Sequence, residues 1–142
     1  MNGGGHLTVL VDADSCPAAV REMLMRSAAR RGYGLEFLAN RELGLGGGRR
    51  ATVVTGHTVD EEIVARVAEM AIRDIPVLVV TRDIPLAEAV LNAGGHAMND
   101  RGTVFDAASI AERRSLRDAA AVIRAAGLES MSRRREFGPR ER

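Results

Sequence analysis

Apolar residues follow two different spacings along the chain, and the spacings predict strands and helices in turn. Short apolar runs at 7–11, 35–39, 51–55, 76–81 and 96–98 have the length and the β-branched content of buried strands. Between these runs, apolar residues recur every three or four positions, as in a helix that buries one face. The run at 76–81 is almost continuously apolar, which is typical of a central parallel strand covered on both faces.

The ends of the helices are marked by residues that favour such ends. Pro17 and Pro85 each follow a predicted strand, and proline suits a first helical turn because that turn needs no N–H donor there. Thr58 and Glu61 have the spacing of a capping box. The predicted helices cover about 17–32, 58–73, 85–93 and 103–127.

Strands that alternate with helices indicate a three-layer α/β/α fold with a mainly parallel central sheet. Residues 1–128 are expected to form this domain, and residues 129–142 to be a polar, arginine-rich and disordered tail. The glycine-rich segment 44–48 is predicted to be a loop that leads Arg49 and Arg50 into a short strand.

Composition narrows the functional classes. The formal net charge of +1 argues against a broad electropositive surface for nucleic acid, so any basic patch must be local. All 20 basic residues are arginine, which excludes Schiff-base lysine chemistry and a P-loop. One cysteine cannot form an internal disulfide, and no apolar stretch is long enough for a membrane span or a signal peptide. A cytoplasmic protein is expected.

Acidic residues follow the predicted strands. Asp12 and Asp14 come directly after the first strand, Asp60 begins a helix, and Asp83 follows the central strand. Because the carboxyl ends of parallel strands meet at one edge of a sheet, these four carboxylates are expected to lie close together. Their mutual repulsion must be offset by a bound cation, a basic partner or a shared proton. A site of oxygen ligands without His or Cys favours Mg²⁺ or Mn²⁺. Any single one of these acids has the alternative role of a helix cap, although a cap needs only one side chain.

Several segments resemble a known family. These are Val11-Asp12-Ala13-Asp14-Ser15-Cys16-Pro17, Ala39-Asn40-Arg41, Asp60-Glu61-Glu62-Ile63-Val64, Thr81-Arg82-Asp83-Ile84-Pro85-Leu86-Ala87 and Arg101-Gly102. Together they look like the YaiI/YqxD family of uncharacterised bacterial proteins over roughly residues 7–128. The resemblance implies a PIN-like fold and metal-dependent phosphodiester hydrolysis. It implies Asp12, Asp14, Asp60 and Asp83 as metal ligands, with Asp12 and Asp83 central to catalysis.

A nuclease of this kind needs groups that hold phosphate. Arg82 and Arg101 are the first candidates, Arg49 and Arg50 on the glycine-rich loop are the second, and Asn40 is a further substrate-binding candidate. Each arginine has the alternative reading of a solvated surface residue. RNA is the expected polynucleotide partner in preference to DNA, and a homo-oligomer is compatible with the sequence but not indicated by it.

Other chemistries remain open with less support. The Asp-x-Asp pattern and Thr81 resemble haloacid-dehalogenase-like phosphatases, but the lysine and the later acidic pair of those enzymes are missing. Cys16 cannot belong to a cysteine-phosphatase loop because Arg21 follows it by five positions instead of six, so it is read as a small buried residue. The scattered histidines suggest no zinc site. A non-catalytic domain that binds RNA or protein is the third alternative.

Overall fold

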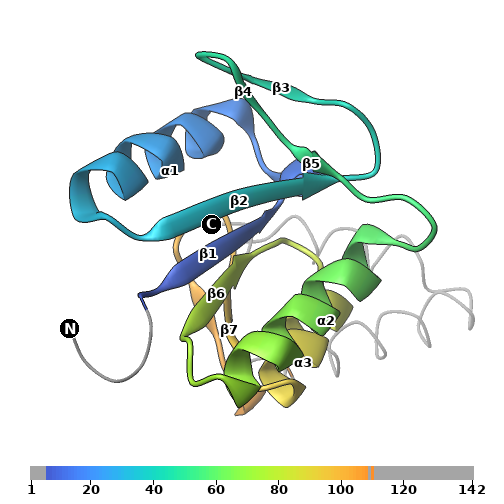
Figure 1. Ribbon diagram of the computed structural model, residues 1–142. Helices are drawn as coiled ribbons and strands as arrows, with labels where there is room; N and C mark the ends of the chain where they lie inside the picture. Colours follow the sequence, from blue (N-terminus) through green and yellow to red (C-terminus); the bar gives the residue numbers. More distant parts are fainter. Residues whose placement is uncertain (1–5, 109, 111–142) are drawn as a thin grey trace, which may run out of the picture. The chain divides into compact units, whose positions relative to one another are not determined.

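The computed structural model describes residues 6–108 and 110 of the chain (Figure 1). The chain divides into two compact units, Met1–Ala107 and Ala108–Arg142. Every strand and helix described below belongs to the first unit. The predicted helix beyond residue 110, the predicted boundary at residue 128 and the predicted arginine-rich tail lie outside the described residues.

A six-stranded, mainly parallel sheet forms the centre of the first unit, which confirms the predicted fold class. The strands lie in the order β5-β2-β1-β6-β7-β8, and only β8 runs antiparallel to its neighbour. Their bounds are β1 (Thr8–Asp12), β2 (Gly34–Ala39), β5 (Thr52–Val53), β6 (Val77–Val80), β7 (His96–Met98) and β8 (Val104–Phe105). The chain builds outward from β1 to β5 and then returns to β6 on the other side of β1, so the order of the strands reverses between β1 and β6.

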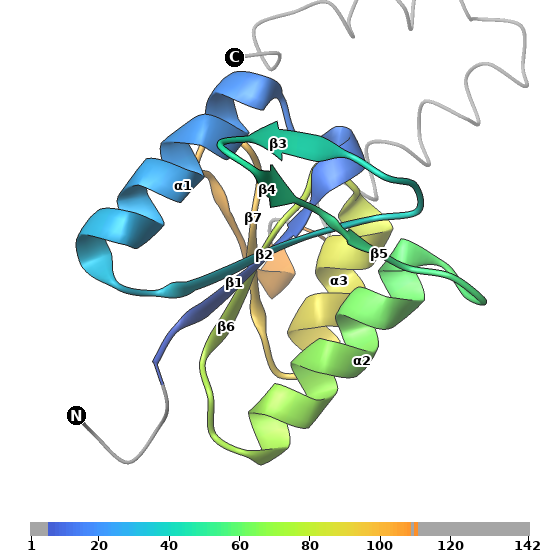
Figure 2. The same ribbon diagram turned by 45° about the horizontal axis from the view of Figure 1, so that its top comes forward.

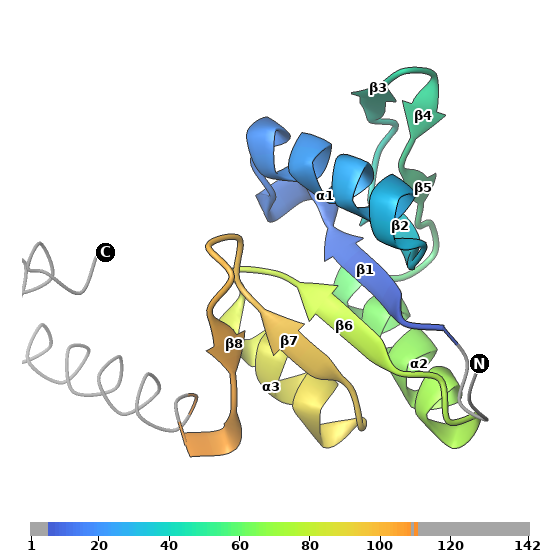
Figure 3. The ribbon, with the colours of Figure 1, turned by 90° about the vertical axis from the view of Figure 1, so that its left-hand side faces the viewer.

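Helices cover both faces of this sheet. Helix α1 (Ala18–Arg31) lies on one face, whereas α2 (Val59–Ile72) and α3 (Ile84–Asn92) lie on the other (Figures 1 and 3). The predicted capping box at Thr58 and Glu61 is present at the start of α2. A single 3-10 turn, η1 (Ala13–Ser15), separates β1 from α1. The resulting three layers are those predicted.

The core holds the ends of β1 and β6 in fixed positions. Val9, Leu10 and Val11 of β1 and Val79 and Val80 of β6 are all buried. Burial of an aliphatic side chain of this size stabilises the fold by about 1.5–3 kcal/mol. The residues that follow these two strands are therefore carried by the most firmly packed part of the sheet.

Two predictions about secondary structure were wrong. The segment predicted as a glycine-rich loop forms a β-hairpin of β3 (Gly44–Gly46) and β4 (Arg49–Arg50), which pair apart from the main sheet (Figure 2). Leu45, the central residue of β3, is buried and fixes the hairpin to the core. The glycines on either side of Leu45 made the segment resemble a loop in the sequence.

Val104 and Phe105 form strand β8 instead of the start of a helix. The turn before them is closed by Asn99, whose Oδ1 accepts hydrogen bonds from the N–H groups of Arg101 and Thr103. This reversal brings Phe105 opposite Ala97, where its side chain is buried. Burial of this aromatic side chain favours pairing of Val104 and Phe105 with β7 over the predicted helix at these two positions.

Candidate functional site at the carboxyl edge of the sheet

The reversal of strand order places two predicted site residues side by side. Asp12 is the last residue of β1, and Asp83 caps the N-terminus of α3 just beyond β6. The parallel register pairs Val11 with Val80, so β1 and β6 end together. Asp60 occupies the first turn of α2, the helix that leads into β6. In open α/β sheets, ligands bind at such a switch point, beyond the carboxyl ends of the strands.

Asp12 is held by two hydroxyl groups. The hydroxyls of Ser15 and Thr81 donate hydrogen bonds to its Oδ2 atom at 3.2 and 3.3 Å. The Thr81 hydroxyl, which is buried, also accepts a hydrogen bond of 3.0 Å from the N–H of Asp83. Thr81 therefore ties the end of β1 to the start of α3.

The pKa values of Asp12 and Asp60 are raised in part by the charges of neighbouring carboxylates. Burial raises the pKa of Asp12, the two hydroxyl hydrogen bonds oppose that rise, and the charges of Asp14 and Asp83 add to it. The pKa of Asp60 is raised by burial and then by the charges of Asp83 and Asp12. Asp12, Asp60 and Asp83 are called the carboxylate cluster below. Within the described residues, none of the three forms an ion pair.

Asp14 has a different environment. Its Oδ1 lies 3.3 Å from Nη2 of Arg41, and both side chains are partly exposed. Arg41 directly follows Asn40, just past the end of β2, at the same edge of the sheet. Sequence analysis did not single out Arg41, although the same edge rule that placed the acids would have found it. Asp14 is thus the one predicted ligand that has a cationic neighbour of its own.

The predicted phosphate-binding residues fall into two groups. Arg82 donates two hydrogen bonds to Asp100, from Nε to Oδ1 at 3.0 Å and from Nη2 to Oδ2 at 2.8 Å. This pairing lowers the pKa of Asp100. Asn40 and Arg101 are exposed, in the segments after β2 and β7.

Arg49 has a role in the fold. Its Nη2 donates a hydrogen bond of 2.7 Å to the backbone oxygen of Leu35, and its guanidinium lies 5.8 Å from the centre of the Phe37 ring. The side chain thereby covers the outer edge of β2. Arg49 is not brought to the carboxylate cluster by any contact in the described structure.

A metal centre is not assembled in advance. In the part of the chain that the structure describes, no three or more His, Cys, Asp or Glu side chains are arranged to hold a metal ion. The carboxylates of the cluster are near enough to shift pKa values without forming a coordination shell. Metal binding by Asp12, Asp14, Asp60 and Asp83 therefore stays a prediction.

Sequence reasoning missed the hydroxyl donors to Asp12, because Ser15 and Thr81 are small polar residues of a kind found throughout proteins. Cys16 is buried as expected, and its burial raises the pKa of the thiol. His57 lies 2.6 Å from Glu62 and has no contact with the cluster among the described residues. No described helix has the length and hydropathy that crossing a membrane requires.

Comparisons with known proteins identify relatives over most of the chain. A family model described as "Uncharacterized BCR, YaiI/YqxD family" matches residues 10–142. A UPF0178 protein of Halorhodospira halophila is 39% identical over 128 residues, which cover 87% of this chain and 81% of the relative. A UPF0178 protein of Vibrio cholerae is 37% identical over 142 residues, covering 92% and 91% of the two chains. No solved structure matches the chain.

Proposed function

The chain belongs to the uncharacterised YaiI/YqxD family, and from the carboxylate cluster we propose that it is a divalent-metal-dependent nuclease that hydrolyses phosphodiester bonds, preferably in RNA. The observation that carries the proposal is the meeting of Asp12, Asp60 and Asp83 at the point where the strand order reverses. The resemblance of the Asp-x-Asp and Thr81–Ala87 segments to a PIN-like family supports the same reaction.

A cation would offset the like charges of the cluster. Burial and neighbouring carboxylates raise the pKa values of Asp12 and Asp60, so bound positive charge would favour their ionised forms. A purely structural site would include an arginine, as the neighbouring Asp14 does with Arg41. The cluster instead contains carboxylates and hydroxyls, which are the hard oxygen donors that Mg²⁺ and Mn²⁺ prefer.

In this proposal the ion is held by carboxylate oxygens. Asp12 is fixed by its two hydroxyl donors, and the more exposed Asp60 would turn toward the ion when it binds. When bound, Mg²⁺ or Mn²⁺ supplies an activated water and positive charge opposite the scissile phosphate. Asp12 and Asp83 are the central ligands in this proposal, with Asp60 and Asp14 completing the set.

The protein supplies its own positive groups for a phosphate. The N-termini of α2 and α3 both lie at this edge, and their N–H groups and dipoles favour an anion there. Arg82 already binds one carboxylate through two parallel hydrogen bonds, which is the geometry that also suits phosphate oxygens. Arg82 and Arg101 are the proposed substrate-binding arginines, and Asn40, after β2, is a further substrate-binding candidate.

The proposal is tested with Asp12→Asn in a cleavage assay on single-stranded RNA and DNA with Mn²⁺ or Mg²⁺. Asparagine keeps an oxygen for the Ser15 and Thr81 hydroxyls and removes the charge. The matched control is Asp74→Asn, the same substitution at an exposed residue after α2. We expect metal-dependent cleavage of RNA that Asp12→Asn lowers at least about 100-fold and Asp74→Asn leaves unchanged.

Three results would contradict the proposal. Cleavage that is unaffected by Asp12→Asn belongs to a contaminant or to another site. Release of phosphate from small monoesters with polynucleotides intact favours the haloacid-dehalogenase-like phosphatase. Binding of RNA without cleavage in any divalent metal favours the non-catalytic domain.

Metal binding has its own readout. Mn²⁺ at about 100 times its dissociation constant stabilises a protein that binds it only when folded by about 2.7 kcal/mol. We expect Mn²⁺ to raise the melting temperature of the parent and of Asp74→Asn, and to have little effect on Asp12→Asn. An equal rise in melting temperature in all three proteins would show that Mn²⁺ does not bind at the cluster.

A further inference from the structure

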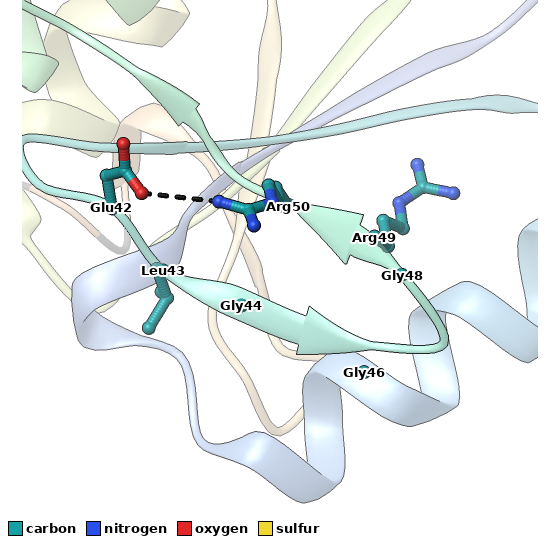
Figure 4. A pocket seen from close by; sticks show the side chains of 7 residues that line it. All are labelled: Glu42, Leu43, Gly44, Gly46, Gly48, Arg49 and Arg50. Carbon is teal, nitrogen blue, oxygen red and sulfur yellow. Dashed lines mark hydrogen bonds and ion pairs between the residues drawn. The ribbon is translucent and has the colours of Figure 1, made fainter.

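The hairpin β3–β4 carries a cavity that the carboxylate cluster does not use. Its volume is about 300 Å³, and it is lined by Gly44, Gly46 and Gly48 together with Glu42, Arg49 and Arg50 (Figure 4). The hairpin starts just after Arg41, the residue whose guanidinium reaches Asp14. The cavity is therefore linked to the carboxyl edge of the sheet by one ion pair and a few residues of chain.

The hairpin is held firmly at its base. Leu45 is buried in the core beside α1, and the N–H of Ala51 donates a hydrogen bond of 3.0 Å to the oxygen of Leu43. Arg49 is fixed to β2 through Leu35 and Phe37. A ligand on the hairpin would meet a fixed surface and not a loop that must first be ordered.

The glycines leave the backbone open. A side chain added at Gly44, Gly46 or Gly48 would meet no other atom within 4 Å, so free space lies over all three. Gly46, Gly47 and Gly48 have positive φ angles of 92°, 60° and 79°, which residues with a side chain rarely adopt. Because such a surface has no side chains of its own, an extended ligand can approach its peptide groups closely.

The charge of the cavity favours an anion. The charged residues of the lining are two arginines, Arg49 and Arg50, and one glutamate, Glu42. The ion pair between Arg50 Nη1 and Glu42 Oε1, at 3.2 Å, is weak because the two side chains are 75% and 81% exposed. Figure 4 shows Arg50 directed toward Glu42 and Arg49 directed away from it. The Arg50 guanidinium is therefore available to a stronger anionic partner at small cost.

We propose that the β3–β4 hairpin is a phosphate-binding arm, which holds the backbone of single-stranded RNA next to the carboxyl edge through Arg50 and the open glycine surface. This inference rests on the proposed nuclease function, whose substrate would extend beyond the scissile phosphate onto the hairpin. Glu42 occupies Arg50 when no RNA is bound, and a phosphate displaces it.

The test is fluorescence anisotropy with a labelled single-stranded RNA of about 12 nucleotides, in the presence of a chelator so that cleavage plays no part. We expect Arg50→Gln to weaken binding about three- to tenfold and to lower the salt dependence by about one phosphate contact. Glu42→Gln, which removes the competing carboxylate, should tighten binding by about twofold.

The chain offers a matched control in Arg73 and Glu69, another exposed arginine–glutamate pair, whose Nη1 and Oε2 atoms lie 3.9 Å apart on α2. Arg73→Gln and Glu69→Gln make the same changes in charge far from the hairpin in sequence. We expect both to keep the parent's affinity and its salt dependence. Circular dichroism and melting temperature verify that all four variants are folded.

The outcomes separate this inference from the proposed function. Equal losses for Arg50→Gln and Arg73→Gln, or no binding by the parent, would overturn the arm. Binding that depends on Arg50 but is followed by no cleavage with Mn²⁺ would support the arm and remove the nuclease. If cleavage depends on Asp12 but Arg50→Gln leaves the affinity for RNA unchanged, the nuclease proposal stands and the phosphate-binding arm is rejected.

Discussion

Two acids near the start of helix α2 lie in regions of opposite character, because the pKa of Asp60 is raised and that of Glu62 is lowered. Asp60, in the first turn of α2, belongs to the carboxylate cluster, where its charge meets those of Asp12 and Asp83. Two positions later, Glu62 lies between Arg66 and His57, with its Oε2 atom 2.7 Å from Arg66 Nε and its Oε1 atom 2.6 Å from His57 Nε2. Arg66 also contacts Glu36 of β2. We call Glu36, Glu62, Arg66 and His57 the ion network.

The difference separates stability from function. In the ion network Arg66 pairs with Glu36 and Glu62, and hydrogen bonds with Arg66 and His57 lower the pKa of Glu62. In the carboxylate cluster the pKa values of Asp12 and Asp60 are raised. Arg66 thus neutralises acids where α2 meets the sheet, whereas Asp12, Asp60 and Asp83 form no ion pair with any described residue at the carboxyl edge. Such an arrangement is typical of a site kept for binding at some loss of stability.

The largest expected effect comes from removing a charge from the cluster without removing a helix cap. Asp83→Asn retains an oxygen for the N–H of Leu86, and asparagine is as good an N-cap as aspartate. We expect metal-dependent RNA cleavage to fall at least about 100-fold, or about 2.7 kcal/mol in kcat/KM. Glu36→Gln, in the ion network, should keep kcat/KM within about twofold. Similar losses in both variants would mean that the two regions are not distinct.

The next effect concerns stability and should appear in the other region. Arg66→Met leaves Glu36 and Glu62 half-buried without their shared cation, and we expect the free energy of unfolding to fall by about 2 kcal/mol. Arg41→Met breaks only the exposed pair with Asp14, so it should change that free energy by less than about 0.5 kcal/mol. Urea denaturation measures both. An equal fall for the two variants would show that the ion network has no special weight in the fold.

A smaller effect should distinguish two acids in the same helical turn. Asp60→Asn and Glu62→Gln both remove a negative charge near the positive end of α2, so the interaction with the helix dipole is lost in both. We expect Glu62→Gln to lower the free energy of unfolding by about 1 kcal/mol through its weaker bond to Arg66. Asp60→Asn should leave it unchanged or raise it. A larger loss at Asp60 would contradict the assignment of repulsion to the cluster.

The smallest effect is the pH dependence of stability in the presence of a chelator. The pKa of Asp12 in the fold is above its ordinary 3.8, so its contribution to stability is complete below that value and is lost as the pH rises through the raised pKa. The pKa of Glu62 is below its ordinary 4.5, so its contribution is present above 4.5 and is lost as the pH falls through the lowered pKa.

Relative to the parent, Asp12→Asn should therefore gain stability as the pH rises above about 4, and the deficit of Glu62→Gln should become smaller as the pH falls below about 4.5. Solvent screening limits each change to roughly a few tenths of a kcal/mol. Unfolding in urea across this pH range measures both differences. Opposite slopes would exchange the roles of the two regions.

Elements governed by local chemistry were predictable from the sequence. The capping box at Thr58, the strand at Val77–Val80 and the parallel order all depend on residues within one short segment or on a general rule of sheet topology. The position of the acids followed from the same rule, because an aspartate after a parallel strand has only one edge to occupy. On that basis the sequence predicted that Asp12, Asp14, Asp60 and Asp83 share the carboxyl edge of the sheet.

Features that depend on packing between distant segments were not predictable. The pairing of Gly44 with Arg50 follows from the burial of Leu45, and β8 follows from the burial of Phe105. Two ion pairs join segments that are distant in the chain. Asp14 and Arg41 are 27 positions apart, and Glu36 and Arg66 are 30 positions apart. Spacing alone cannot identify which of the 20 arginines pairs with a given acid. The sequence therefore did not distinguish Asp14, which pairs with Arg41, from Asp12, Asp60 and Asp83.

The hydrogen bond from Arg49 to the Leu35 backbone has a consequence for how the protein behaves in concentrated solution. Strand β5 pairs with only Leu38 and Ala39, so the outer side of β2 before them is not continued by β5. An open strand edge is a template on which a second chain can add a strand, which leads to aggregation. Arg49 donates a hydrogen bond to the Leu35 oxygen and places a positive charge over that edge. Both features disfavour the pairing of a second chain with β2.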